Sequence, residues 1–523
     1  MPRIRSLFRR LLIPGGSRRE QLVQTGYTLI TLLRQQRAPA PGEGEVGGRE
    51  RPFPPWKTLL HQARIPRQFA QDMRAFWQRA IHSVAYLQAA YSYQHWINKR
   101  EPKERELSRQ RREANTFAYR PLISFLTPVY NPEASVLRDT LQSVQAQTYP
   151  HWEFCLANGS TNPEIGRLLD EFARQDGRFH IIHLSENLGI AENTNRALQV
   201  AQGEFIALLD HDDLVSPDML FAVVSDLNQD PTWDIIYFDE DKVSENGQAR
   251  HDPWFKPTQW SPDLLLSTNH LMHSVIRRAL VNDVGGFDPG VDGAQDWDLS
   301  LRLVEKTRQI HHIPRVFYHW RQVVGSAARD ANAKPWAFAA QERCLRQHLQ
   351  RQGYENVQIS FPRLGTVRLI WPSHNAKVSI IIPTKNNLPL LQACLDSILT
   401  KTTYPFYEIL VVDNQSDDPA VAGYYQEVSN HPRIRILDYP HPYNFQKINN
   451  WAAGQCDGEV LLFLNNDTEV IEPTWLEEMA GWAMRPETGV VGTKLLRPNG
   501  KIQHAGLIIG LIGHGSHVFE DCD

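Results

Sequence analysis

The fold of this chain is decided by the stretch GEFIALLDHDD, residues 203–213. Its five apolar residues, 205–209, are typical of a buried strand, and the strand ends abruptly in carboxylates. Open α/β sheets bind ligands at the carboxyl ends of their strands, so these acidic residues stand where a site would lie. Asp210 and Asp212 suit a hard divalent cation, and a solvated loop after a core strand is the alternative at this point.

Size and charge limit the class of protein. With 523 residues and 41% apolar content, the chain has room for two or three ordinary domains. Residues 1–120 carry 23 Lys/Arg against 9 Asp/Glu, a balance of +14, which leaves −18 on the other 403 residues. A basic N-terminal part indicates an anionic partner, either membrane lipid, a polyphosphate substrate or nucleic acid. We favour peripheral contact with an anionic membrane and expect no nucleic acid.

The sequence also indicates a compartment. Residues 1–19 are rich in Arg, and their short apolar segment is too brief to span a bilayer and lacks a convincing cleavage site. The five cysteines are scattered without a Cys-x-x-Cys spacing, so neither a zinc site nor a disulfide framework is indicated. We therefore expect a cytoplasmic protein, peripheral on the inner face of the plasma membrane.

Composition divides the chain into four regions. Residues 1–55 are a basic, flexible segment that ends in a linker rich in Pro and Gly, and residues 56–118 form a helical region whose apolar stripe is packing surface. From residue 119, strands alternate with helices, which predicts a mainly parallel sheet. We expect strands at 122–127, 153–157, 180–184 and 204–209. We expect a solvated helix at 99–112 and a further helix at 337–351.

An internal repeat sets the limits of the last two regions. Pairs of matching residues recur at one offset of 255 residues, among them Pro128 with Pro383, Asn131 with Asn386 and Asp212 with Asp467. Chance similarity would not hold one offset over so many positions, so the chain contains the same α/β unit twice. We expect one unit at 119–372 and a second, C-terminally incomplete unit at 373–523.

Polar loops follow the first three predicted strands. They span residues 127–131, 158–161 and 187–189, which are the positions that line the ligand crevice of an open sheet. The sequence has no Gly-x-Gly-x-x-Gly after the first strand and no P-loop motif, which argues against a dinucleotide dehydrogenase and a P-loop phosphotransferase. A pyrophosphate would have to be held mainly by metal.

An ordered series of motifs carries a family resemblance. PVYN (128–131), NLG (187–189), DHDD (210–213), YFDEDK (237–242), GGFD (285–288) and QDWD (295–298) follow one another as in family 2 glycosyltransferases. The first unit thus resembles enzymes with the GT-A fold that build bacterial surface polysaccharides such as O-antigen or capsule. The second unit resembles the first half of the same domain.

The resemblance implies a role for each matching residue. Pro128 and Tyr130 would lie in the nucleotide pocket with Asn131, Asn158 and Asn187, and Asp210 would lie on the ribose or diphosphate side. Asp212 would bind Mg²⁺ or Mn²⁺, and Asp296 would be the general base that removes a proton from the acceptor hydroxyl. His319 is a candidate third metal ligand or diphosphate contact.

Alternatives stay open for several of these residues and for the acidic run 239–241. Asp296 can instead be the N-cap of a helix, and His319 can be a buried structural histidine. The acidic residues 239–241 either border the acceptor cleft or form a solvated loop. Asn158 stands where the family commonly has Asp, which leaves the identity of the nucleotide open.

The implied reaction has a donor and an acceptor. A nucleotide-diphospho-sugar would give its sugar, with inversion, to a hydroxyl of a glycan or lipid-linked acceptor. In the second unit, Pro383, Asp413 and Asp467 would serve any nucleotide binding, but its acidic turn is Asn465-Asn466-Asp467 and it has no counterpart of Asp296. We predict that the second unit is catalytically incompetent. The rival hypothesis is a non-catalytic scaffold that binds sugar nucleotides or glycans.

Overall fold

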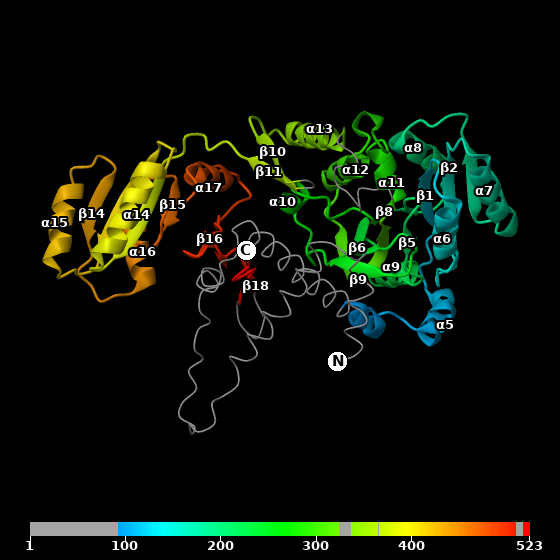
Figure 1. Cartoon of the computed structure of the whole chain (residues 1–523), viewed down its shortest axis with the longest axis horizontal. Helices are drawn as coiled ribbons and strands as arrows, with labels where there is room; N and C mark the ends of the chain where they lie inside the picture. Colours follow the sequence, from blue (N-terminus) through cyan, green and yellow to red (C-terminus); the bar gives the residue numbers. More distant parts are fainter. Residues whose placement is uncertain (1–92, 324–335, 364–365, 509–515, 523) are drawn as a thin grey trace, which may run out of the picture. The chain divides into compact units, whose positions relative to one another are not determined.

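The computed structural model describes residues 93–323, 336–363, 366–508 and 516–522 (Figure 1). All of them belong to one compact part of the chain, residues 86–523, which includes both α/β units. The predictions for residues 1–55 and for the apolar helical stripe that follows them lie outside the described residues. Within the described ranges, no helix has the length and apolar character needed to cross a membrane.

The helix predicted over 99–112 is interrupted. Residues 93–100 are helical, and a second helix, α5, runs over Glu104–Glu113 and leads into the short helix η1, Ala114–Thr116. Pro102 lies in the break, where its ring and missing N–H prevent one continuous helix. The rest of the predicted range, residues 104–112, is helical as expected. Helix α5 carries Glu in its first turn and Arg in its last turn, which the helix dipole favours.

The first unit is built on a nine-stranded sheet with the order β3-β2-β1-β4-β8-β6-β9-β5, and β7 pairs with β6. Strands β1 to β4 are parallel to their neighbours in this group, whereas β8 is antiparallel to both β4 and β6. The sheet is therefore mainly parallel, as predicted. Its strands are β1 Ile123–Val129, β2 Trp152–Asn158, β3 Phe179–His183, β4 Phe205–Leu208, β5 Leu214–Val215, β6 Ile235–Val243, β7 Arg250–Trp254, β8 Val275–Arg277 and β9 Ile310–Arg321.

Helices cover both faces of this sheet. Successive residues of β1 point to opposite faces, so Phe125 packs into one core and Leu126 into the other. Helices α6, α7 and α9 contribute to the first core, and α8, α12 and α13 contribute to the second. The helices of the unit are α6 Ala134–Gln145, α7 Pro163–Gln175, α8 Ile190–Val200, α9 Met219–Gln229, α10 Pro262–Leu265, α11 Arg278–Asp283, η2 Pro289–Val291, α12 Gln295–Val304 and α13 Trp336–Arg351.

The second unit has a smaller, four-stranded parallel sheet with the order β14-β13-β12-β15. A hairpin, β10 Gln358–Arg363 and β11 Thr366–Ile370, precedes it in the chain. Its elements are β12 Val378–Thr384, α14 Leu388–Lys401, β13 Tyr407–Asp413, α15 Pro419–Val428, β14 Ile434–Asp438, α16 Phe445–Ala453, β15 Val460–Phe463 and α17 Trp475–Ala483, followed by the two-residue to three-residue strands β16 Leu495–Leu496, β17 Ile502–His504, β18 Leu507–Ile508 and β19 Ser516–His517.

The two sheets share their strand order and their hydrogen bonds. The order β14-β13-β12-β15 matches β3-β2-β1-β4, and the registers of the paired strands correspond at the offset of 255 residues. A buried serine on the central strand donates to a glutamate on its neighbour in both sheets, from Ser124 to Glu153 at 2.6 Å and from Ser379 to Glu408 at 2.7 Å. The repeat in the sequence is therefore a repeat in the structure.

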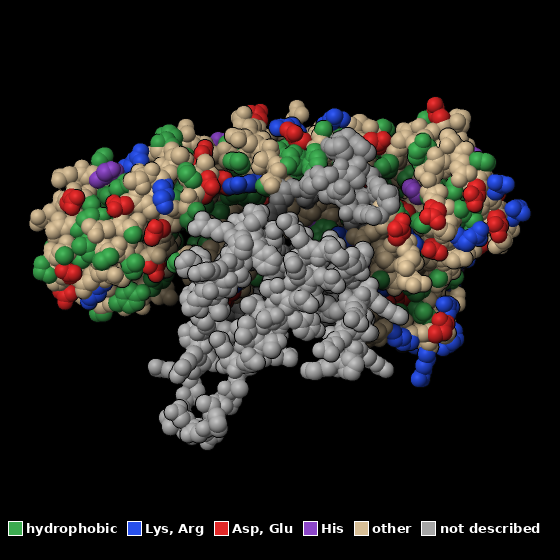
Figure 2. Space-filling view, in the orientation of Figure 1, with side chains coloured by type: hydrophobic (Ala, Val, Ile, Leu, Met, Phe, Trp, Pro, Cys, Tyr) green, Lys and Arg blue, Asp and Glu red, His purple; other side chains and the backbone are tan. Residues whose placement is uncertain are grey.

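Charge is mixed over the described surface. Figure 2 shows Lys and Arg side chains interspersed with Asp and Glu side chains on the visible face. The excess of basic residues that the sequence shows is concentrated before residue 121, and most of that region lies outside the described residues.

Candidate active site

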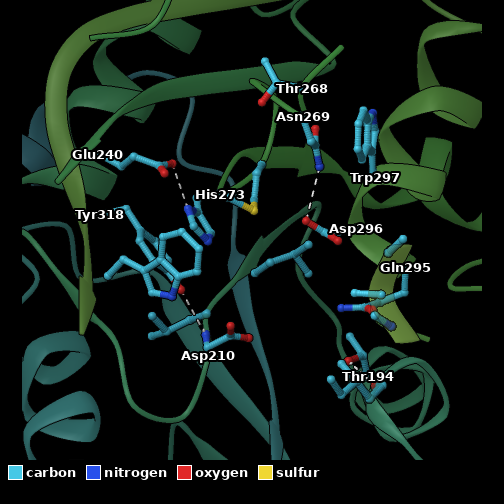
Figure 3. Close-up of a pocket in the computed structure, with 18 of the residues that line it drawn as sticks. Thr194, Asp210, Glu240, Thr268, Asn269, His273, Gln295, Asp296, Trp297 and Tyr318 are labelled. Atoms are coloured by element: carbon cyan, nitrogen blue, oxygen red, sulfur yellow. Dashed lines mark hydrogen bonds and ion pairs between the residues drawn. The ribbon is translucent and has the colours of Figure 1, made fainter. Parts of the chain in front are cut away.

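The first unit contains a cavity of about 560 Å³ at the carboxyl ends of β1 and β4. Its walls come from the ends of these strands, from β6, from the turn 268–273 and from the start of α12. Figure 3 shows its polar lining, in which Asn269 points to Asp296 and Glu240 points to His273. The lining also includes the sequence-predicted residues Pro128, Asp210 and Asp296 and the aromatic residues Trp254, Trp297, Tyr318 and Trp320.

The acidic turn gathers three carboxylates at the edge of this cavity. One oxygen each of Asp210, Asp212 and Asp213 lies within 4.8 Å of the other two. Asp213 is buried and accepts hydrogen bonds from the Tyr318 hydroxyl at 2.6 Å and from the backbone N–H of Arg321 at 2.7 Å. Burial, together with the charges of Asp212 and Asp210, raises the pKa of Asp213 well above its usual value.

Arg321 fixes the backbone of the turn. Its side chain is 1% exposed, and it donates from Nε to the carbonyl oxygen of Asp212 at 2.8 Å and from a terminal nitrogen to the Asp139 carboxylate at 3.1 Å. A guanidinium that is fully engaged by protein oxygens holds the chain in one position. The turn is therefore preorganised by β9, which the sequence pattern did not reveal.

The donor set fits a hard divalent cation. Mg²⁺ and Mn²⁺ prefer oxygen ligands, and two of the three carboxylates, those of Asp210 and Asp212, are not fully buried. After burial, the nearby charges of Asp212 and Asp210 are the main reasons that the pKa of Asp213 is raised, and a cation would offset this repulsion. The described residues contain this one group of three potential metal-ligating side chains.

His319 does not share this arrangement. Its Nδ1 lies 2.7 Å from the Asp241 carboxylate and its Nε2 lies 2.9 Å from the Ser216 hydroxyl, and the side chain is buried. Since both ring nitrogens have protein partners, none is left to bind a cation at the acidic turn. The geometry argues against the predicted metal-ligand role of His319 and agrees with the alternative of a buried structural histidine.

Asp296 lies in the first turn of α12 but is not its N-cap, which is Ala294. The amide of Asn269 donates to the Asp296 carboxylate at 3.2 Å. Burial raises the pKa of Asp296; nearby His273 opposes this shift, and the Asp210 charge adds to it. A carboxylate with a raised pKa is a better proton acceptor, so the environment suits a general base.

The acidic residues 239–241 are not a solvated loop, because they lie within β6 and are buried. Asp239 bonds to His312 at 2.9 Å, and Asp241 accepts from the Tyr93 hydroxyl at 2.6 Å. Burial alone would raise the pKa of Glu240, but the Lys256 ammonium and His273 bring it down to about 2. The loop interpretation was wrong because each carboxylate has its own partner inside the protein.

Tyr130 and Asn131 shape the loop after β1. Tyr130 is 48% exposed. Asn131 has a positive φ of 45°, and its side-chain oxygen accepts from the backbone N–H groups of Thr161 and Asn162. These bonds tie the loop after β1 to the loop after β2, and neither Tyr130 nor Asn131 lines the cavity.

Asn158 and Asn187 also make internal bonds. The Asn158 amide bonds to His183 at 3.1 Å and accepts from the backbone N–H of Ser160. The Asn187 side-chain oxygen accepts from the amide of Asn193 at 2.8 Å. Both asparagines lie outside the cavity lining. Of the predicted nucleotide residues, Pro128 and Asp210 line the cavity, the three asparagines hold the neighbouring loops, and Tyr130 is exposed outside it.

The predicted residues of the second unit lie at the carboxyl ends of its strands. Asp413 is buried and accepts from the Tyr425 hydroxyl at 2.7 Å. Asp467 is exposed, and its neighbour Asn466 donates to the Thr384 hydroxyl at 2.9 Å. Pro383 precedes this threonine at the end of β12 and is half-buried.

Sequence reasoning missed His273, Asn269 and Lys256. Asn269 and His273 belong to a short irregular segment between α10 and β8, where no periodic pattern marks them. The only available signal was the unusual density of polar residues between two apolar runs.

A comparison with protein families identifies the class. The model of the family "Glycosyl transferase family 2" matches residues 124–285 and 379–513, which together are more than half of the chain. The chain belongs to this family. The family expected from the ordered motifs is confirmed, and the two matched segments begin 255 residues apart, like the two sheets.

Individual relatives extend the similarity over most of the chain. The Sinorhizobium fredii protein y4gI is 44% identical over 404 residues, which are 76% of this chain and 44% of that protein. The O-antigen biosynthesis protein RfbC of Myxococcus xanthus is 40% identical over 430 residues, which are 82% of this chain and 33% of RfbC. The chain thus spans less than half the length of either relative.

Among solved structures, residues 1–349 of S. aureus TarS in complex with UDP-GlcNAc align with a TM-score of 0.35 and 18% identity. The alignment covers 44% of this chain and 72% of that chain.

Proposed function

We propose that the first unit is an inverting, metal-dependent glycosyltransferase. It moves a sugar from a nucleotide-diphospho-sugar to a hydroxyl of a glycan or lipid-linked acceptor in polysaccharide biosynthesis. The observation that carries this proposal is that one cavity presents Asp210, from the group of three carboxylates, and Asp296 on its wall. Membership of family 2 and the similarity to an O-antigen biosynthesis protein support it.

The reaction needs a proton acceptor and a place for the leaving group. The acceptor oxygen attacks the anomeric carbon, the bond from that carbon to the diphosphate oxygen breaks, and Asp296 takes the hydroxyl proton. Asn269 keeps the Asp296 carboxylate in position through its hydrogen bond. Because the attack is direct, the configuration of the anomeric carbon inverts and no covalent sugar intermediate is needed.

The diphosphate would leave at the acidic turn. Asp210 and Asp212 would hold Mg²⁺ or Mn²⁺, with Asp213 behind them, and such an ion would supply positive charge opposite the leaving group. Tyr318 and Arg321 keep the turn in place through their bonds to Asp213.

The second candidate is a non-catalytic scaffold that binds sugar nucleotides or glycans. Asn158 and the altered acidic turn of the second unit favour it, because both remove carboxylates that the family commonly carries. A scaffold would bind a donor without turning it over.

A panel of nucleotide sugars tests the two candidates. We expect one donor to release nucleoside diphosphate only when a glycan or lipid-linked acceptor and Mn²⁺ or Mg²⁺ are present, and EDTA should abolish the release. Binding measured by calorimetry with no turnover across the panel would instead support the scaffold.

We also propose that the basic N-terminal segment brings the protein to the inner face of the plasma membrane. The +14 balance of residues 1–120 is the observation that supports this. Deleting residues 1–50 should weaken flotation with anionic vesicles, and the wild-type flotation should fall as salt rises. Equal flotation of the full-length and shortened proteins would discard the idea.

A further inference from the structure

A histidine that the proposed mechanism does not use lies on the wall of the cavity. His273 is 8% exposed and has a positive φ of 60°, a conformation that L residues rarely adopt. Its ring lies flat on the Tyr318 ring, with 3.5 Å between the ring centroids and 4° between the planes. A backbone conformation of this kind persists only where surrounding contacts hold it, and such residues concentrate at functional sites.

Two buried charges fix the direction of the His273 ring. Its Nδ1 lies 3.0 Å from a carboxylate oxygen of Glu240. The same carboxylate binds the Lys256 ammonium at 2.8 Å, and that ammonium also donates to the backbone oxygen of Met272, next to His273. Glu240 is ionised, because Lys256 and His273 outweigh its burial and lower its pKa to about 2. An ionised carboxylate only accepts hydrogen bonds, so Nδ1 carries the proton.

The other ring nitrogen is then available to a ligand. With the proton on Nδ1, Nε2 keeps a free lone pair and is a hydrogen-bond acceptor. It has no hydrogen-bond partner in the part of the chain that the structure describes. Figure 3 shows the His273 ring between Glu240 and Asp296.

The chemistry of Nε2 selects one part of the donor. A diphosphate has no proton to give to an acceptor nitrogen at neutral pH, whereas every sugar hydroxyl has one. Tyr318, on which His273 lies, contacts the acidic turn through Asp213 and through the backbone N–H of Asp210. His273 therefore lies on the wall of the cavity next to the acidic turn, where the diphosphate of the donor would bind. The sugar of the donor would lie between the acidic turn and Asp296.

We propose that His273 is a specificity-determining residue that accepts a hydrogen bond at Nε2 from a hydroxyl of the transferred sugar. Glu240 and Lys256 are positioning residues that keep the ring turned toward the cavity. This inference rests on the proposed glycosyltransferase function and adds to it the part of the donor that is recognised.

The test separates the sugar from the rest of the donor. Full-length wild type and His273→Asn are titrated by calorimetry with UDP-GlcNAc, UDP-galactose, GDP-mannose and dTDP-rhamnose, and with the matching nucleoside diphosphates, all with Mn²⁺. Asn tolerates positive φ but is too short to replace Nε2. We expect the variant to lose about tenfold in affinity for the nucleotide sugar that wild type prefers, and less than about twofold for its nucleoside diphosphate.

His311→Asn is the matched control. His311 pairs with the Asp226 carboxylate at 2.8 Å and stacks on Trp233, as His273 pairs and stacks, but it lies outside the cavity lining. Both affinities of this control should equal those of wild type. Parallel losses for nucleotide sugar and nucleoside diphosphate in His273→Asn, or no loss in either, would overturn the role of His273.

A different result would overturn the proposed function. If wild type binds none of the nucleotide sugars and transfers none of these sugars, the glycosyltransferase proposal fails, and the inference on His273 falls with it. If wild type binds one donor and His273→Asn binds it equally well, only the inference on His273 fails.

Discussion

The two units keep the same framework but differ at the acidic turn. Both have the strand order of a central pair flanked by two parallel neighbours, and both have the buried Ser–Glu bond that joins the central strand to its neighbour. In the first unit the turn is DHDD, with Tyr318 and Arg321 of β9 bonded to Asp213. In the second unit it is NND, and Asn466, at the position that matches His211, bonds to Thr384. The contacts that stabilise the four shared strands are thus independent of the acidic residues that carry the proposed chemistry.

The largest effect is expected at Asp296, in the first unit. Asp296→Asn removes the proposed proton acceptor while keeping an oxygen that can accept the bond from Asn269. The transfer rate should fall by about 10²-fold to 10⁴-fold, the contribution typical of general base catalysis. Steady-state kinetics measures the loss, and thermal unfolding checks that the variant is folded. Unchanged kcat would assign the base to another residue.

The next largest effect compares the two acidic turns directly. Asp212→Asn should lower metal-dependent activity by about 100-fold, because it removes a proposed ligand from a carboxylate group that has two other members. Asp467→Asn, at the matching position of the second unit, should leave activity within about twofold of wild type. Titration of activity with Mn²⁺ measures both variants. Equal losses would show that the second unit contributes to the reaction.

A smaller effect is expected from pH. Burial holds the pKa of Asp296 above the usual aspartate value of 3.8, and the proposed base acts only when it is deprotonated. The rate should therefore fall as pH decreases through this raised pKa, and the acid limb of kcat/KM should lie above pH 3.8. The residual rate of Asp296→Asn should lack this limb. Intrinsic fluorescence at each pH distinguishes loss of the base from acid unfolding, and a limb below pH 3.8 would contradict the prediction.

The smallest effect should be the same in both units. A Cβ at Gly203 would lie 2.7 Å from the backbone N of Ser124, and a Cβ at Gly458 would lie 2.7 Å from the backbone N of Ser379. Gly203→Ala and Gly458→Ala should each lower the free energy of unfolding by about 1–3 kcal/mol, as overpacking does. Denaturant unfolding measures both, and it tests whether the shared framework is equally tight. A cost in only one unit would show that the other has relaxed.

Much of the fold was predictable because its signals are local. Each of the first four strands was predicted to within two residues of its observed ends, since buried apolar runs bounded by polar loops mark strands of a parallel sheet. The one offset of 255 residues likewise predicted the second sheet before its strands were placed. The convergence of Pro128, Asp210 and Asp296 followed from the ordered motifs.

The features that the sequence did not predict depend on contacts between residues that are far apart in the chain. Three consecutive acidic residues look like a solvated loop, and only partners up to 148 residues away make β6 a buried strand. Likewise, no local pattern predicts that His273 adopts a positive φ and lies on Tyr318. For the same reason, the sequence could not choose between a metal ligand and a buried structural histidine at position 319, whose ring nitrogens contact Asp241 and Ser216.

The buried acidic run of β6 has a consequence for how the chain assembles during synthesis. The partners of Asp239 and Glu240, namely His312, Lys256 and His273, all follow β6 in the sequence, as do Arg250 and His319, which bind Asp241. A nascent chain that ends soon after β6 would hold carboxylates without cations, and burying them would be costly. Strand β6 should therefore join the sheet only after β9 has been synthesised. The central strands of the first unit would then assemble late during synthesis, in one cooperative step.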